Sequence, residues 1–322
     1  MVRFLSKSQQ RIISFLKKIT RTLKSPDFIK KTAIYFFLFI ILYWIGSFLP
    51  EGFDWKSSFK VGRYHPIWTP WTKPIIQLLA PFGYGVIFSL SVIGISLRAY
   101  RYKQNTLPIF LALISMPTLW VFFIGNIDGL VLFGLLFMPA GIPLVLMKPQ
   151  LAAFLLLAKR SWIIWGFVFG IFSLLIWGMW PLKLFMVVTP EWKSEWMQDI
   201  SLFPWGLILG LPLLWFSRGD QDLLMAAGSL FTPHLFPYHF ILLMPALARM
   251  KWQWMIITWL LSWTPLLSNW LGPSAWHFGN ILSLCFWIGI FFEPKNNKGL
   301  NFIKKDLSSL YNQLGSMKWF KT

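Results

Sequence analysis

Residues 125–150 read GNIDGLVLFGLLFMPAGIPLVLMKPQ, and the interpretation of the fold depends on this stretch. Asp128 and Lys148 stand near its two ends, separated by an apolar run from Leu130 to Met147. An acid or a lysine at membrane depth costs several kcal/mol unless it is paired or hydrated, so both are candidate functional residues. The run between them is about 18 residues and could nearly cross a bilayer. The alternative therefore places the two residues at opposite membrane surfaces.

The composition predicts an all-α, polytopic helical membrane protein. Of the 322 residues, 56% are apolar and only 13% are charged, and apolar stretches of membrane-crossing length recur along the chain. In a soluble protein the net charge of +19 would suggest nucleic acid. Here it indicates cytoplasmic loops beside an anionic leaflet, with membrane lipid and no nucleic acid as partner. The single cysteine, Cys285, excludes an intrachain disulfide.

Three regions are expected: a basic amphipathic cytoplasmic segment (1–31), a transmembrane domain (32–292) and a basic amphipathic tail (293–322). In both end regions apolar residues recur at helical spacing among lysines, which predicts helices on the inner leaflet over 4–24 and 300–320. About ten crossings are expected, at 32–49, 75–97, 107–124, from 128 onward, 163–180, 202–216, 223–231, 238–247, 252–267 and 278–292. Prolines and glycines interrupt Pro139–Ala158, which predicts a broken or re-entrant hairpin.

Charge distribution predicts the orientation. With both termini cytoplasmic, only six of the 30 lysines and arginines fall in outer loops, as the positive-inside rule requires. Six of the eleven acids and all four histidines then lie on the outer face, where polar chemistry is expected to gather. A multi-pass protein of the cell membrane is the predicted location.

Several motifs of soluble enzymes and pumps are not found. The sequence has no Walker loop, no Gly-x-Gly-x-x-Gly, no cysteine pair and no His-Glu-x-x-His. ATP-driven transport by this chain alone is therefore not expected. No metal site and no bound cofactor are predicted, although acids in a loop leave dependence on a divalent ion open.

Three sequence features together resemble glycosyltransferase family 87, a member of the GT-C superfamily of membrane sugar transferases. The first is Gly125-Asn126-Ile127-Asp128-Gly129 followed by Lys148-Pro149-Gln150, which is similar to the family's Gly-Gln-x-Asn … Lys-Pro-Gln pattern. The second is residues 231–246, FTPHLFPYHFILLMPA, and the third is Asp54 followed by the aromatic and proline-rich stretch 64–70. Asn126 stands where the family usually has Gln, and Asp128 stands where it usually has Asn.

The resemblance implies a GT-C-like fold and an inverting hexosyltransferase. The implied donor is a polyprenyl-phosphate sugar, commonly mannose, used as co-substrate on the outer face with a lipid or glycan acceptor. Asp54 and Asp128 are then the candidate catalytic carboxylates, with Asp54 favoured as the base. Donor-phosphate or substrate contacts are expected from a larger set: Lys148, Gln150, Asn126, His239, His65 and His234.

Each assignment has a structural alternative. Asp54 would be a solvated loop acid, Asp128 a helix cap, Lys148 a cytoplasmic lysine that reaches the surface, and His239 an interfacial residue bonded to a backbone carbonyl. Two other functions also remain open: a lipid-linked glycan transporter or flippase, and a non-catalytic GT-C-like helper protein.

Overall fold

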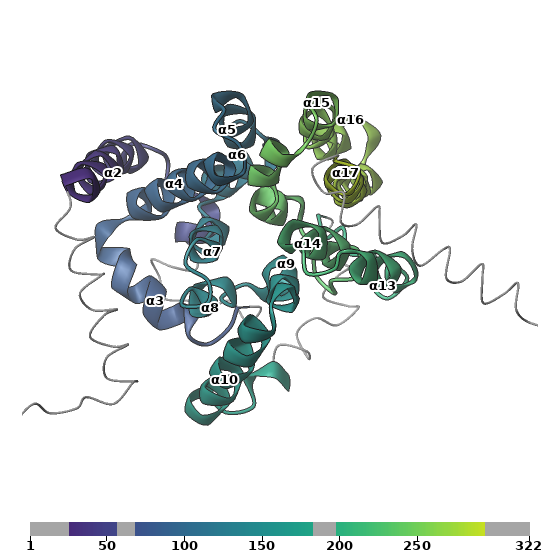
Figure 1. Ribbon diagram of the computed structural model, residues 1–322, viewed down its shortest axis with the longest axis horizontal. Coiled ribbons are helices and arrows are strands. Elements are labelled where there is room, and N and C mark those ends of the chain that lie inside the picture. Colours follow the sequence, from purple (N-terminus) through teal and green to yellow (C-terminus); the bar gives the residue numbers. More distant parts are fainter. Residues whose placement is uncertain (1–25, 57–67, 183–197, 294–322) are drawn as a thin grey trace, which may run out of the picture.

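The computed structural model describes residues 26–56, 68–182 and 198–293. Every regular element within these ranges is helical, which confirms the all-α prediction for this part of the chain (Figure 1). The N-terminal part contains α2 (Pro26–Ser47), α3 (Thr72–Leu79), α4 (Tyr84–Tyr102), α5 (Thr106–Leu113), α6 (Met116–Ile124) and α7 (Asp128–Leu135). The C-terminal part begins with α10 (Arg160–Trp177), α13 (Leu207–Phe216), α14 (Gln221–Ser229), η4 (Pro237–Leu242) and η5 (Met244–Arg249). It ends with α15 (Trp252–Leu261), η6 (Thr264–Leu267), α16 (Ser268–Leu271), η7 (Pro273–Gly279) and α17 (Asn280–Phe291).

Fewer candidate crossings are found in the described residues than the ten expected. Within the described ranges, two helical stretches are long and apolar enough to cross a membrane, Arg160–Trp177 and Pro273–Phe291. Two bent helix pairs would raise the number to four. One joins Thr72–Phe82 to Tyr84–Tyr102 at 107°, where Gly83 has a φ of 73° that favours glycine. Ten transmembrane helices are therefore not confirmed.

The difference from the expected number has a physical cause, which α14 illustrates. Its residues from Asp222 to Ser229 are all buried, and it packs against α13, α17 and η3 (Ala153–Ala158). A helix of nine residues is only about 14 Å long, far less than the 30 Å of a hydrocarbon core. The predicted crossing at 238–247 likewise forms the short 3₁₀ helices η4 and η5. Both segments are apolar because they lie in the protein interior.

Helix α10 has the opposite character. It is 18 residues long, and only 17% of its residues are buried against the rest of the protein. Its exposed side chains include Phe167, Phe172 and Leu175. An extended apolar surface of this kind suits contact with an apolar environment. The predicted broken hairpin is divided into the short pieces α8 (Ile142–Val145), α9 (Pro149–Ala152) and η3.

Helix α7 lies in the interior and places the first residues of the site. It packs against α4, α8 and η4, and seven of its eight residues are buried. Figure 1 shows it between α4 and α8, near the middle of the view. The predicted surface helices over 4–24 and 300–320 lie outside the described residues. Helix α2 begins at Pro26, within the segment that was expected to precede the membrane domain.

Candidate functional site

The structure brings together four of the predicted site residues in one hydrogen-bonded network. The Asn126 amide donates to the Asp54 carboxylate at 2.6 Å. The Lys148 ammonium donates to the Asn126 amide oxygen at 2.9 Å and to the Asp128 carboxylate at 2.5 Å. These side chains come from three segments that are distant in sequence. We call Asp54, Asn126, Asp128 and Lys148 the carboxylate–lysine network.

Two glycines allow the Asp54 segment to approach α6. A Cβ at Gly52 would lie 2.1 Å from the carbonyl carbon of Ile124, so only glycine fits there without movement of the backbone. Gly125 ends α6 with a φ of 73°, and a Cβ on it would meet Trp55 at 2.8 Å. This close contact holds Asp54 beside Asn126, the residue that follows the glycine.

Lys148 is positioned by contacts from residues 69–72. The Thr69 N–H and hydroxyl both donate to the carbonyl of Met147, and the Trp71 indole donates to the carbonyl of Pro143 at 2.8 Å. Pro149 then starts α9, in keeping with the preference for proline in the first turn of a helix. The backbone on both sides of Lys148 is thereby fixed.

Burial excludes the surface alternatives for the two charged residues. The side chains of Lys148 and Asp128 are each only 1% exposed, and the two form an ion pair. Lys148 therefore neither reaches a surface nor lies on the far side of a membrane from Asp128. Asp128 is the first residue of α7 rather than its N-cap, which is Ile127. Its carboxylate accepts from lysine, and the Tyr238 ring lies 4.9 Å from the same ammonium.

His234 and His239 lie close to the network but have different partners. His239 Nδ1 accepts from the backbone N–H of Phe236 at 3.0 Å, so the neutral ring carries its proton on Nε2. That Nε2 lies 4.0 Å from Asp128 and has no hydrogen-bond partner among the described residues. His234 instead pairs with Asp199 at 2.7 Å, and the two histidine ring centroids are 6.3 Å apart.

Gln150 and His65 are the remaining predicted site residues, and neither is part of the carboxylate–lysine network as the structure describes it. Gln150 follows Lys148 by two positions, and its carbonyl accepts from the Thr232 hydroxyl at 2.7 Å. Its side-chain oxygen is buried without a partner in the described part of the chain. His65 lies outside the described residues.

The two loop acids differ in protonation behaviour. Burial raises the pKa of Asp54 above its ordinary value, although the Lys148 charge and the Asn126 hydrogen bond lower it in part and the Asp128 charge raises it. Burial by itself would also raise the pKa of Asp199. The hydrogen bond and charge of His234, with two backbone N–H donors, outweigh it, so this pKa lies below its usual value. Asp54 is thus the stronger base of the two.

The charged groups of the network differ in how accessible they are. No group of three histidine, cysteine or acidic side chains suited to a metal ion occurs in residues 26–56, 68–182 and 198–293. Asp54 is half-buried, whereas Asp128 and Lys148 are closed off, so Asp54 is the carboxylate that a second molecule can reach.

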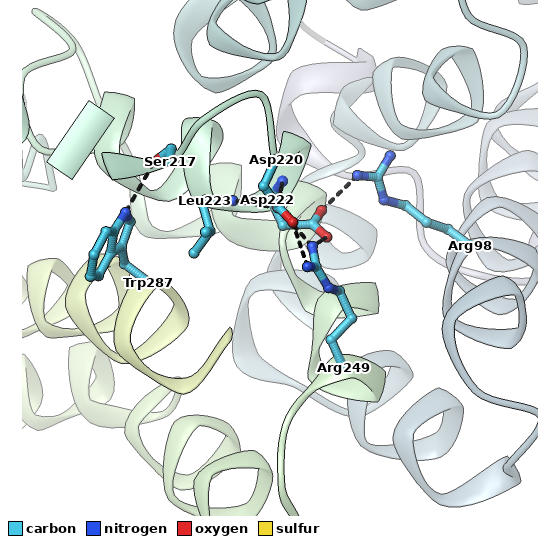
Figure 2. Close-up of polar contacts among 7 residues, drawn as sticks. All are labelled: Arg98, Ser217, Asp220, Asp222, Leu223, Arg249 and Trp287. Carbon is cyan, nitrogen blue, oxygen red and sulfur yellow. Dashed lines mark hydrogen bonds and ion pairs between the residues drawn. The ribbon is translucent and has the colours of Figure 1, made fainter. Parts of the chain in front are cut away.

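A second buried cluster of charges, which the sequence interpretation missed, lies at the other end of α4. Arg98 donates to Asp222 at 2.7 Å, and Arg249 donates to Asp222 at 2.6 Å and to Asp220 at 2.5 and 2.7 Å (Figure 2). Asp220 also caps α14 by accepting from the N–H groups of Asp222 and Leu223. The sequence shows these charged residues beside apolar runs, but it does not show which of them pair, because Arg98 and Asp222 are 124 positions apart.

Comparison with known proteins finds no matching family model, no similar curated protein and no similar solved structure.

Proposed function

We propose that the chain is a membrane glycosyltransferase that moves a sugar, mannose in the first instance, from a polyprenyl-phosphate donor to a lipid or glycan acceptor. The observation that carries the proposal is the carboxylate–lysine network, in which an accessible carboxylate is oriented by buried polar groups. The resemblance of these residues to the family 87 pattern supplies the reaction class.

Asp54 is the general base in this proposal. It accepts the proton of the acceptor hydroxyl as the oxygen forms a bond to the anomeric carbon, while the bond from that carbon to the phosphate oxygen breaks. The phosphate leaves with the bonding electron pair, and the configuration at carbon inverts. A base works best when its pKa lies near the working pH, so the raised pKa of Asp54 favours this role.

Asn126, Lys148 and Asp128 act as positioning residues. Asn126 holds one carboxylate oxygen of Asp54 by donating to it, and its own carbonyl is held by Lys148. Asp128 neutralises the Lys148 charge, which would be costly to bury alone. We assign the Nε2–H of His239 and the side chain of Gln150 to substrate contacts, because each has a polar atom without a hydrogen-bond partner among the described residues.

An apolar cavity whose wall includes Pro50, four residues before Asp54, is suited to the lipid chain of the donor. It has a volume of about 790 Å³ and is lined by side chains from α2, α4, α5 and α6. Leu49 and Pro50 in its wall directly precede the Asp54 segment, and Ile124 directly precedes Gly125 and Asn126. A prenyl chain in this cavity would have its phosphate end close to the carboxylate.

The finer membrane arrangement is part of the proposal. We place the Asp54 segment on the outer face and both termini in the cytoplasm, on the strength of the lysine and arginine distribution. Labelling of single cysteines introduced at residues 51 and 103, with and without permeabilisation, tests this placement. Labelling of position 51 only after permeabilisation would contradict it.

The test of function uses purified protein, radiolabelled polyprenyl-phosphate mannose and a lipid acceptor extract. Asp54→Asn should reduce transfer by at least about 10²-fold, because removal of a general base typically costs 10²–10⁴-fold. Donor binding should survive, since the lost interaction forms mainly in the transition state. Glu51→Gln is the matched control, because it neutralises another acid of the same segment outside the network.

The other outcomes discriminate the alternatives. Transfer that is unchanged in Asp54→Asn would overturn the proposal. Donor movement across a vesicle membrane without sugar transfer would favour a lipid-linked glycan transporter. Neither transfer nor movement by the wild-type protein would favour a helper role.

A further inference from the structure

A polar cavity lies beside the second charge cluster. Its volume is about 250 Å³, and its polar lining comes from Arg98, Arg101, Tyr102 and Gln221. Since a water molecule occupies about 30 Å³ of liquid, the cavity has room for a phosphate group with ordered water. Tyr84, near the start of α4, packs against Trp55 of the Asp54 segment. Arg98 follows Tyr84 by about 20 Å along the helix, so the two sites are separate.

The cavity has an excess of positive charge. Asp222 pairs with both Arg98 and Arg249, and Asp220 pairs with Arg249, so these four side chains balance one another. Arg101, which is exposed, is then the cation of the lining that pairs with no acidic side chain among the described residues, and it donates to the Leu136 carbonyl through one nitrogen.

One buried donor and the start of α10 add to this preference for an anion. Arg98 is 4% exposed, and its Nε–H has no hydrogen-bond partner among the described residues. Trp162, in the first turn of α10, lines the cavity, and the Lys159 ammonium lies 4.8 Å from its ring. A helix N-terminus carries partial positive charge, which favours an anion nearby. The guanidinium fork of arginine suits phosphate oxygens in particular.

We propose that the cavity between Arg98, Arg101 and Gln221 binds a phosphate group, presented by an anionic lipid headgroup or by a free phosphate compound. Basic pockets between helices bind phospholipid headgroups in other membrane proteins. The proposal rests on its own residues and stands whether or not the chain transfers sugars.

The experiment measures binding of inorganic phosphate by calorimetry and retention of phosphatidic acid by native mass spectrometry, on full-length protein in neutral detergent. Arg101→Gln should weaken binding about tenfold, which corresponds to about 1.4 kcal/mol. Lys103→Gln is the matched control, because it removes a charge two residues away that does not line the cavity.

A second variant, Gln221→Leu, removes a polar lining group without changing charge and should also weaken binding. Retained phosphatidic acid that excess phosphate does not displace would identify a lipid as the source. Binding of free phosphate by lipid-free protein would identify a soluble source. Binding of neither ligand by the wild-type protein, or equal loss in Arg101→Gln and Lys103→Gln, would overturn the proposal.

Discussion

Replacement of Lys148 by methionine tests whether the carboxylate–lysine network is held together by charge. The network contains two carboxylates and one ammonium, so its net charge is −1 with all three ionised. Lys148→Met leaves Asp54 and Asp128 with no cation between them. Asp128→Asn leaves one carboxylate and one ammonium, which balance. Lys148→Met should therefore lower the free energy of unfolding by more than Asp128→Asn does.

The magnitude follows from the ways in which each variant can relax. Protonation of a carboxylate with an ordinary pKa near 3.9 at pH 7 costs about 4 kcal/mol, and this bounds the charge penalty in Lys148→Met. We expect Lys148→Met to lower the free energy of unfolding by about 3–5 kcal/mol, the range for a buried ion pair that loses one partner. Asp128→Asn keeps an oxygen that accepts from lysine and should cost about 1–2 kcal/mol. The double variant removes the excess acid and should be more stable than Lys148→Met alone.

The assay is unfolding of the detergent-solubilised protein by SDS, followed by tryptophan fluorescence, at several pH values. Lys148 lowers the pKa of Asp54 in the wild type, so its loss should raise that pKa further. A carboxyl with a higher pKa in the folded state binds more protons folded than unfolded. Lys148→Met should therefore gain stability as the pH falls from 7 toward the unfolded value near 4, by up to about 1.4 kcal/mol per pH unit.

Two results would refute this reasoning. One is simple additivity of the two single substitutions, because residues in contact should show a coupling energy of at least about 0.5 kcal/mol. The other is a Lys148→Met variant whose stability does not depend on pH over this range.

Two further predictions concern stability. Gly52→Ala should destabilise the protein by more than about 2 kcal/mol, since its Cβ would lie 2.1 Å from a backbone carbon of Ile124. Gly170→Ala is the matched control in a helix interior with open space, and it should be neutral or stabilising by about 0.5–1 kcal/mol in the same SDS titration. Asp199 has a lowered pKa, so its contribution is complete above pH 4 and is lost only as the pH falls below that value. Asp199→Asn should lower the Tm at pH 7 and flatten the acid limb of Tm against pH; an unchanged Tm at pH 7 would contradict this role.

Two of the polar residues that meet in the candidate site could be predicted from the sequence, because charge in an apolar chain is costly. Asp128 and Lys148 could be singled out for this reason alone, and their pairing satisfies that cost. The contact of Asp54 with Asn126 links positions 72 apart and depends on the close approach of Gly52 to α6. No periodicity in the sequence encodes such an approach. The resemblance to family 87 supplied Asp54, which local pattern would have left as a loop acid.

Hydropathy could not predict the number of crossings, since burial in protein and burial in lipid select the same residue types. The nine residues of α14 and the exposed 18-residue α10 both read as apolar runs. Length separates them in the structure, because only α10 approaches the thickness of a bilayer core. The cluster of Arg98 and Asp222 was not predicted, for a related reason. Each residue stands at the end of a predicted crossing, where a charged side chain is expected at the membrane surface.

The charge count also decides between the two roles available to Lys148. A cation that stabilises a departing phosphate must have charge to spare, but the Lys148 ammonium is within 2.5 Å of Asp128 and is closed off from solvent. Its attraction for a phosphate is offset by that carboxylate, so the residue is better suited to orienting Asn126 and, through it, Asp54. Asp128 is excluded as the proton acceptor by access, since its side chain is only 1% exposed and is already paired with Lys148. Asp54 is therefore the carboxylate that combines access, orientation by Asn126 and a raised pKa.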